Sequence, residues 1–243
     1  MKSVFLVSLC IFLSLPLFAQ RNLDGKTEFI YRKEFSVGAR INTNGWTVFG
    51  ETAKILNIHK TRVLQFELTA FKHPKERKQS IPFSSSSRND FIFGKQNNFF
   101  AFHANYGFKK QIADKARKSG VRLSMTYLAG VSLGILKPYY IEIDKPRTSI
   151  KYTGENEEVF LNVQNITGAS GFKKGIGEIE PVPGAHGKFG LNFDWASHDE
   201  ILKAMEIGIS ADIYYKIIPI MVTENNKPYM INFYLGVQFG KRS

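Results

Sequence analysis

Few side chains in this sequence are suited to acid–base catalysis, and they lie far apart. His73 and His186 fall near the expected ends of extended segments, and an unbroken serine run, Ser84–Ser87, follows His73 in a long connection. A serine hydroxyl becomes a nucleophile when a histidine lies within hydrogen-bond reach. A Ser–His hydrolase at the rim of the fold is therefore one hypothesis. Such a serine run is also typical of a plain linker, and we expect no catalytic residues.

Metal and cofactor chemistry has equally little support in the sequence. His73 and His186 with Glu76 or Asp90 form a conceivable ligand set, but no HExxH or comparable spacing accompanies them. The glycines of 171–177 lack the Gly-Lys-Ser/Thr ending of a phosphate-binding loop. We therefore predict no metal site and no cofactor.

The dominant pattern is an alternation of apolar and polar residues with a period of two. A β-strand turns successive side chains to opposite faces, and seven segments follow that pattern, while 46–56 alternates poorly. This segment follows Asn44-Gly45, which is a strong signal for a tight hairpin turn. The predicted strands are 31–43, 45–56, 61–73, 97–110, 119–140, 186–196, 203–220 and 227–240.

These segments predict an all-β fold, an eight-stranded antiparallel up-and-down transmembrane β-barrel. Most of them reach the roughly 9–11 residues that a tilted strand needs to cross a bilayer. The two longest connections, 74–96 and 141–185, fall on one side of such a barrel, as the extracellular loops of outer-membrane barrels do. The connection 111–118 is rich in Ala, Lys and Asp and suggests one or two helical turns.

The polar face of the strands combines small residues with charges of both signs. A narrow eight-stranded barrel has room only for side chains that fill it, and buried charges need partners. We therefore predict a polar network in the lumen, with His103 as a further hydrogen-bonded residue inside. Its predicted members are Glu34, Arg40, Glu67, Arg122, Asp194, Glu206, Asp212 and Lys216. Alternation alone leaves open a soluble barrel with its apolar residues inside.

The N-terminus has the features of a secretory signal peptide. Lys2 precedes an apolar run, 4–18, which ends at the small residue Ala19. We predict a signal peptide over 1–19 and a single outer-membrane β-barrel domain over 20–243. Cys10, the only cysteine, would leave with the signal, so the mature chain would have no disulfide.

The formal net charge of +12 favours phosphate-rich surfaces. In an exported protein these are outer-membrane lipid and lipopolysaccharide, and no nucleic-acid motif is present. The expected partners are these lipids, the barrel assembly machinery during biogenesis, and a protein bound through the extracellular loops. We predict no nucleic-acid partner.

Six motifs, taken in order, resemble a family of Bacteroidetes-type outer-membrane β-barrel proteins without an assigned activity. They are Asn42–Trp46, Lys72–Glu76, Phe93–Lys95, Leu133–Pro138, Gly190–Phe193 and Ile218–Met221. The resemblance covers most of the mature chain and implies the fold and the location, but no catalytic residues. The segment Tyr234–Phe239 also resembles the C-terminal signal read by the barrel assembly machinery, although the chain continues with Gly240–Ser243.

From these observations we expect an outer-membrane barrel without a catalytic site, structural or accessory to a surface or secretion complex. Its termini would lie in the periplasm, and loop 141–185 would present an extracellular binding surface. Two alternatives stay open. One is a narrow porin-like channel for small solutes, and the other is an outer-membrane enzyme that hydrolyses lipid or peptide.

Overall fold

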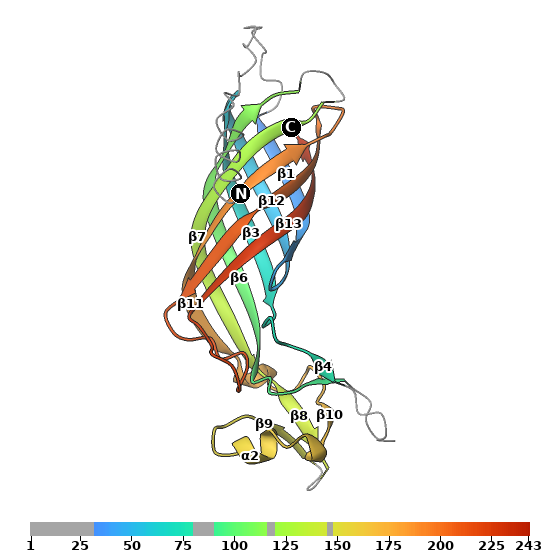
Figure 1. The fold of residues 1–243 in the computed structure, drawn as a ribbon. Helices are drawn as coiled ribbons and strands as arrows, with labels where there is room; N and C mark the ends of the chain where they lie inside the picture. The colour runs from blue at the N-terminus through green and yellow to red at the C-terminus, as the bar shows by residue number, and fades with distance from the viewer. Residues whose placement is uncertain (1–31, 80–89, 116–119, 145–147) are drawn as a thin grey trace, which may run out of the picture.

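The computed structural model describes residues 32–79, 90–115, 120–144 and 148–243, so the expected signal peptide, 1–19, lies outside the described residues. Eight long strands in this part of the chain form a closed antiparallel barrel (Figure 1). They are β1 (Lys33–Asn42), β2 (Gly45–Asn57), β3 (Lys60–Phe71), β6 (Asn97–Ala113), β7 (Arg122–Pro138), β11 (Glu180–Asp194), β12 (Ile201–Tyr214) and β13 (Tyr229–Arg242). Each barrel strand pairs with the next one along the chain, and β1 pairs with β13 to close the cylinder. The predicted eight-stranded up-and-down barrel is confirmed.

Side chains alternate between the two faces of the wall as the period of two predicts. On β1, Phe35 and Ile41 are 62% and 75% exposed, whereas Glu34, Ser36 and Arg40 are buried. The barrel therefore has an apolar outer surface and a polar interior. No helix among the described residues is long and apolar enough to cross a membrane.

Two strand boundaries differ from the predicted ones by six residues, and most of the others differ by one to three. β11 begins at Glu180, six residues before the predicted start. Two prolines, at 181 and 183, interrupt the apolar pattern in this stretch, but the strand continues through them. β12 ends at Tyr214 instead of 220, since the following segment folds back over the barrel. Residues 111–113 extend β6 where we expected a helical turn. Residues 114 and 115 have no regular structure, and 116–118 lie outside the described residues.

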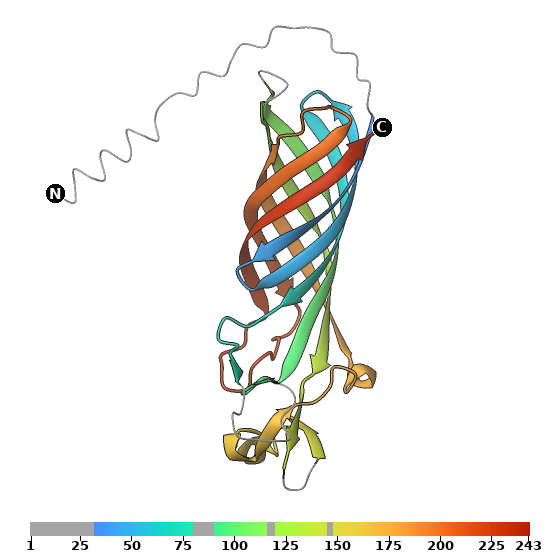
Figure 2. The ribbon, with the colours of Figure 1, turned by 90° about the vertical axis from the view of Figure 1, so that its right-hand side faces the viewer.

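The long connections gather at one end of the barrel, called here the loop end (Figures 1 and 2). The described residues of 139–179, which leave out 145–147, fold into a small unit of their own, the loop module. It contains a three-stranded sheet of order β10-β8-β9 and three short helices. Its elements are β8 (Tyr140–Ile143), β9 (Thr148–Lys151), α2 (Glu157–Phe160), η1 (Val163–Asn165), β10 (Ile166–Ala169) and η2 (Ile176–Glu178).

The loop module has its own apolar core, which also takes in the neighbouring long connection. The fully buried members of this core are Phe91, Ile141, Ile143, Phe160 and Ile166. Phe91 belongs to β5 (Phe91–Ile92), which pairs with β4 (Lys78–Gln79). The predicted loop 141–185 is thus a folded structure, since burying these side chains together stabilises it.

A second apolar cluster, the apolar plug, closes the lumen at the loop end. Phe71, Phe99 and Tyr214 point inward from three strands. The Phe71 and Phe99 rings stack at a centroid distance of 5.3 Å, and Tyr214 meets the Phe99 ring edge-on at 5.1 Å. The segment Ile218–Met221 packs against them. It is held by hydrogen bonds such as that from the Gln96 amide to the Ile220 carbonyl, 2.8 Å. Apolar packing therefore lies between the loop module and the polar interior.

Candidate functional site in the barrel lumen

The middle of the lumen is occupied by a network of ion pairs centred on Arg40. The Arg40 guanidinium lies 2.9 Å from Glu67 Oε1 and 3.7 Å from Glu206 Oε2, and it donates a hydrogen bond to Gln65, 3.0 Å. Lys188 Nζ lies 3.7 Å from Glu67 and 3.5 Å from Glu206. Each of these charges is therefore paired inside the barrel, as burial requires.

A second layer of charges lies toward the end of the barrel opposite the loop end. Lys109 Nζ is 3.3 Å from Glu34 and 3.1 Å from Glu51. Arg242 bridges Glu34 and Asp194, with nitrogen–oxygen distances of 2.8 Å to both. The two layers together place a network of paired charges inside the cylinder.

The structure places six of the eight predicted network residues inside the lumen: Glu34, Arg40, Glu67, Asp194, Glu206 and Asp212. The prediction was wrong for the other two. Arg122 is the first residue of β7 and pairs with Asp114 and Asp199 at the rim, at 3.0 and 3.7 Å. Lys216 lies beyond the end of β12 and pairs with Glu180 at the opposite rim.

Sequence reasoning missed several members of the network, each for a recognisable reason. Glu51 lies in the segment whose alternation is poor. Arg242 lies beyond the predicted end of the last strand, at 240. Lys109 and Lys188 lie within predicted strands, where the parity already puts them on the polar face, but they were not included in the predicted network.

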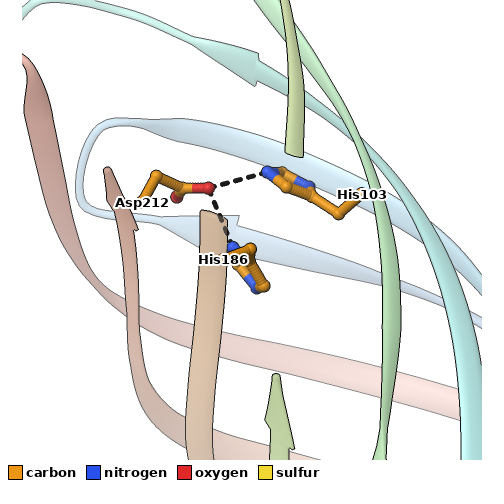
Figure 3. A group of neighbouring side chains, drawn as sticks. All are labelled: His103, His186 and Asp212. Carbon is orange, nitrogen blue, oxygen red and sulfur yellow. Dashed lines mark hydrogen bonds and ion pairs between the residues drawn. The ribbon is translucent and has the colours of Figure 1, made fainter. Parts of the chain in front are cut away.

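The most distinctive group in the lumen joins His103, His186 and Asp212, from β6, β11 and β12 (Figure 3). Asp212 Oδ1 lies 2.8 Å from His103 Nε2 and 2.8 Å from His186 Nδ1. The side chains are nearly inaccessible, with exposed fractions of 1%, 5% and 1% in the order His103, His186 and Asp212. His186 and Asp212 are direct cross-strand partners, and the imidazole rings lie 4.2 Å apart.

His103 lies in the lumen, where the strand parity placed it, but the predicted position of His186 was wrong. We expected His186 near the rim, and it lies inside because β11 begins six residues earlier than predicted. His186 is therefore not available to a rim hydrolase. At the loop end, His73 accepts a hydrogen bond from the Lys75 amide, 3.3 Å. The serine run 84–87 lies outside the described residues.

The hydrogen bonds of this group leave three polar atoms without a partner in the described structure. Asp212 Oδ1 accepts from both imidazoles, and His103 Nδ1, His186 Nε2 and Asp212 Oδ2 are then buried and unpaired. A small cavity, with room for about one water molecule, lies beside His186 and Asp212. These three side chains therefore have unpaired acceptor atoms and lie next to a small cavity.

No protein-family model matches the chain, and no curated protein sequence matches it either, so the family resemblance stays a prediction. Among solved structures the chain is similar to Ail, the attachment invasion locus protein of Yersinia pestis. The TM-score is 0.44 and the identity 9%, over 88% of this chain and 99% of that one. It is also similar to Neisserial surface protein A, with a TM-score of 0.43, 8% identity, and 88% and 97% coverage. A third similar structure is the N-terminal β-barrel domain of Pseudomonas aeruginosa OprF, with a TM-score of 0.35, 10% identity, and 86% and 97% coverage.

Proposed function

We propose that this protein is an outer-membrane β-barrel with a closed lumen that holds the loop module outside the cell as a rigid binding surface. The observation that carries the proposal is the outer surface of the cylinder. Every barrel strand exposes large apolar side chains there, including Val37, Val48, Phe66, Phe102, Val131, Phe189, Ile207 and Phe233. A continuous apolar surface around a charged interior suits hydrocarbon and not water.

Closure of the barrel supports the same proposal. A bilayer offers no hydrogen bonds to the backbone, so a β-structure can span it only when every strand edge is paired. Here the pairing of β1 with β13 leaves no open edge, from Glu34 opposite Arg242 to Asn42 opposite Tyr234.

The orientation can be tested with single cysteines, because the only native cysteine, Cys10, lies in the expected signal peptide. Lys173→Cys places a thiol at the loop end, and His198→Cys places one at the opposite end; both native side chains are exposed. A membrane-impermeant maleimide should label Lys173→Cys in intact cells and His198→Cys only after the outer membrane is permeabilised. The reverse pattern would contradict the proposed orientation.

The filled lumen favours a plugged barrel over a channel for small solutes. Paired charges occupy the middle of the cylinder, and the apolar plug covers the loop end. In planar bilayers the purified protein should produce no stable conductance steps. Regular single-channel steps would refute the closed lumen and support the channel.

We further propose that the loop module serves a surface or secretion complex, as a structural or accessory part. The Ser170 amide donates a hydrogen bond to the Tyr140 carbonyl, 2.9 Å, so the two residues that flank the segment 141–169 lie side by side. A short glycine linker can therefore replace 141–169 while the barrel strands stay whole. Cross-linking in native outer membrane should yield a partner adduct with the full chain and none with the shortened chain. Equal amounts of partner adduct from both chains would contradict a role of the module in binding the partner.

A further inference from the structure

Among the buried acids of the lumen, Asp212 has an unusual set of partners. Each of the others lies within 4.0 Å of an arginine or lysine: Glu34, Glu51, Glu67, Asp194 and Glu206. In the described structure the only ion-pair partners of Asp212 are His103 and His186. An imidazole carries a positive charge only when it is protonated, so the carboxylate of Asp212 lacks the permanent cation that the other buried acids have.

The geometry supplies three ligand atoms on three different strands. One nitrogen from each histidine and one oxygen from Asp212 all lie within 4.8 Å of one another. The further unpaired atoms, His103 Nδ1, His186 Nε2 and Asp212 Oδ2, show that hydrogen bonding within the group does not satisfy these side chains. A bound cation would take the place of the two hydrogen bonds to Asp212, and each imidazole proton would move to the other nitrogen of its ring.

We propose that His103, His186 and Asp212 bind one divalent transition-metal ion. Two imidazole nitrogens and one carboxylate oxygen form a donor set that suits Zn²⁺, which commonly takes three protein ligands and one water. The adjacent cavity, lined by His186 and Asp212, has room for that water. The ion would join strands β6, β11 and β12 beneath the apolar plug.

The binding test uses the untagged full barrel, refolded in detergent with EDTA or with Co²⁺, because the lumen is closed and the ion has to enter during folding. Co²⁺ should bind at one ion per chain and give visible absorption bands. The variants His103→Asn, His186→Asn and Asp212→Asn should each lose most of this absorption. The exposed histidines His59 and His198 provide matched controls, and their Asn variants should bind as the native chain does. Native absorption in all three lumen variants would overturn the proposal.

A second measurement requires no variant and therefore does not depend on whether the substitutions fold. X-ray absorption of the native barrel refolded with Zn²⁺ should show only nitrogen and oxygen ligands, at about 2.0–2.2 Å, with an imidazole signature. The thermal midpoint should also rise when Zn²⁺ is present during refolding, because an ion that binds only the folded state stabilises it. A native chain that retains no metal after refolding would refute the site. This result would leave the proposed location and closed lumen untouched, since neither depends on a metal.

Discussion

Replacing Arg40 with methionine should be among the most damaging single changes to the lumen. The substitution keeps an unbranched side chain but removes the guanidinium that contacts Glu67, Glu206 and Gln65. Breaking a buried ion pair by removing one partner costs about 3–5 kcal/mol, since the other charge stays buried. Lys188 still lies 3.7 Å from Glu67 and can compensate in part. We therefore expect a loss near the lower limit, about 3 kcal/mol.

The assay is reversible urea unfolding of the barrel in lipid vesicles, followed by tryptophan fluorescence. The double variant Arg40→Met, Glu67→Gln removes the unpaired charge together with its partner, and it should be more stable than Arg40→Met alone. Arg62→Met serves as the matched control, because Arg62 is exposed on β3. A loss below about 0.5 kcal/mol for Arg40→Met would mean that water screens these charges as it does at a surface. The description of a dry, paired lumen would then be wrong.

Three further predictions concern packing and the loop module. A Cβ atom at Gly208 would lie 2.2 Å from a backbone oxygen, whereas one at Gly50 would meet nothing within 4 Å. Gly208→Ala should therefore cost about 1–3 kcal/mol in the same unfolding assay, and Gly50→Ala should cost much less. Phe160→Ala removes a core side chain that is 1% exposed. It should weaken the module by about 3–5 kcal/mol, seen as faster proteolysis within 139–179 with an intact barrel. Hydrogen bonds from the Lys151 ammonium and the Tyr140 hydroxyl hold the pKa of Glu178 below its usual value. The module should therefore become less stable as the pH falls through that lowered pKa, and its amide hydrogens should then exchange faster. In Glu178→Gln the exchange rates should show no such dependence on pH.

The sequence alone was sufficient to predict the barrel wall. A period of two assigns each side chain to a face, and this local rule needs no knowledge of distant residues. It placed Arg40 and Glu67 inside and Phe35 outside, as the structure does. The Asn44-Gly45 signal also marked the β1–β2 hairpin, where Gly45 has a φ of 132°. The rule failed at strand ends such as Arg122 and Lys216, because parity does not say where pairing stops.

The tertiary structure decided which inward side chains meet. His103, His186 and Asp212 are separated by 83 and 26 positions, and only the register between β6, β7, β11 and β12 brings them to one level of the cylinder. The loop module was likewise hidden, since its core joins Phe91 to Phe160 across two barrel strands, β6 and β7. Local patterns fix the face on which a residue lies, whereas its neighbours on that face follow from closure of the barrel and from the register of every strand between them.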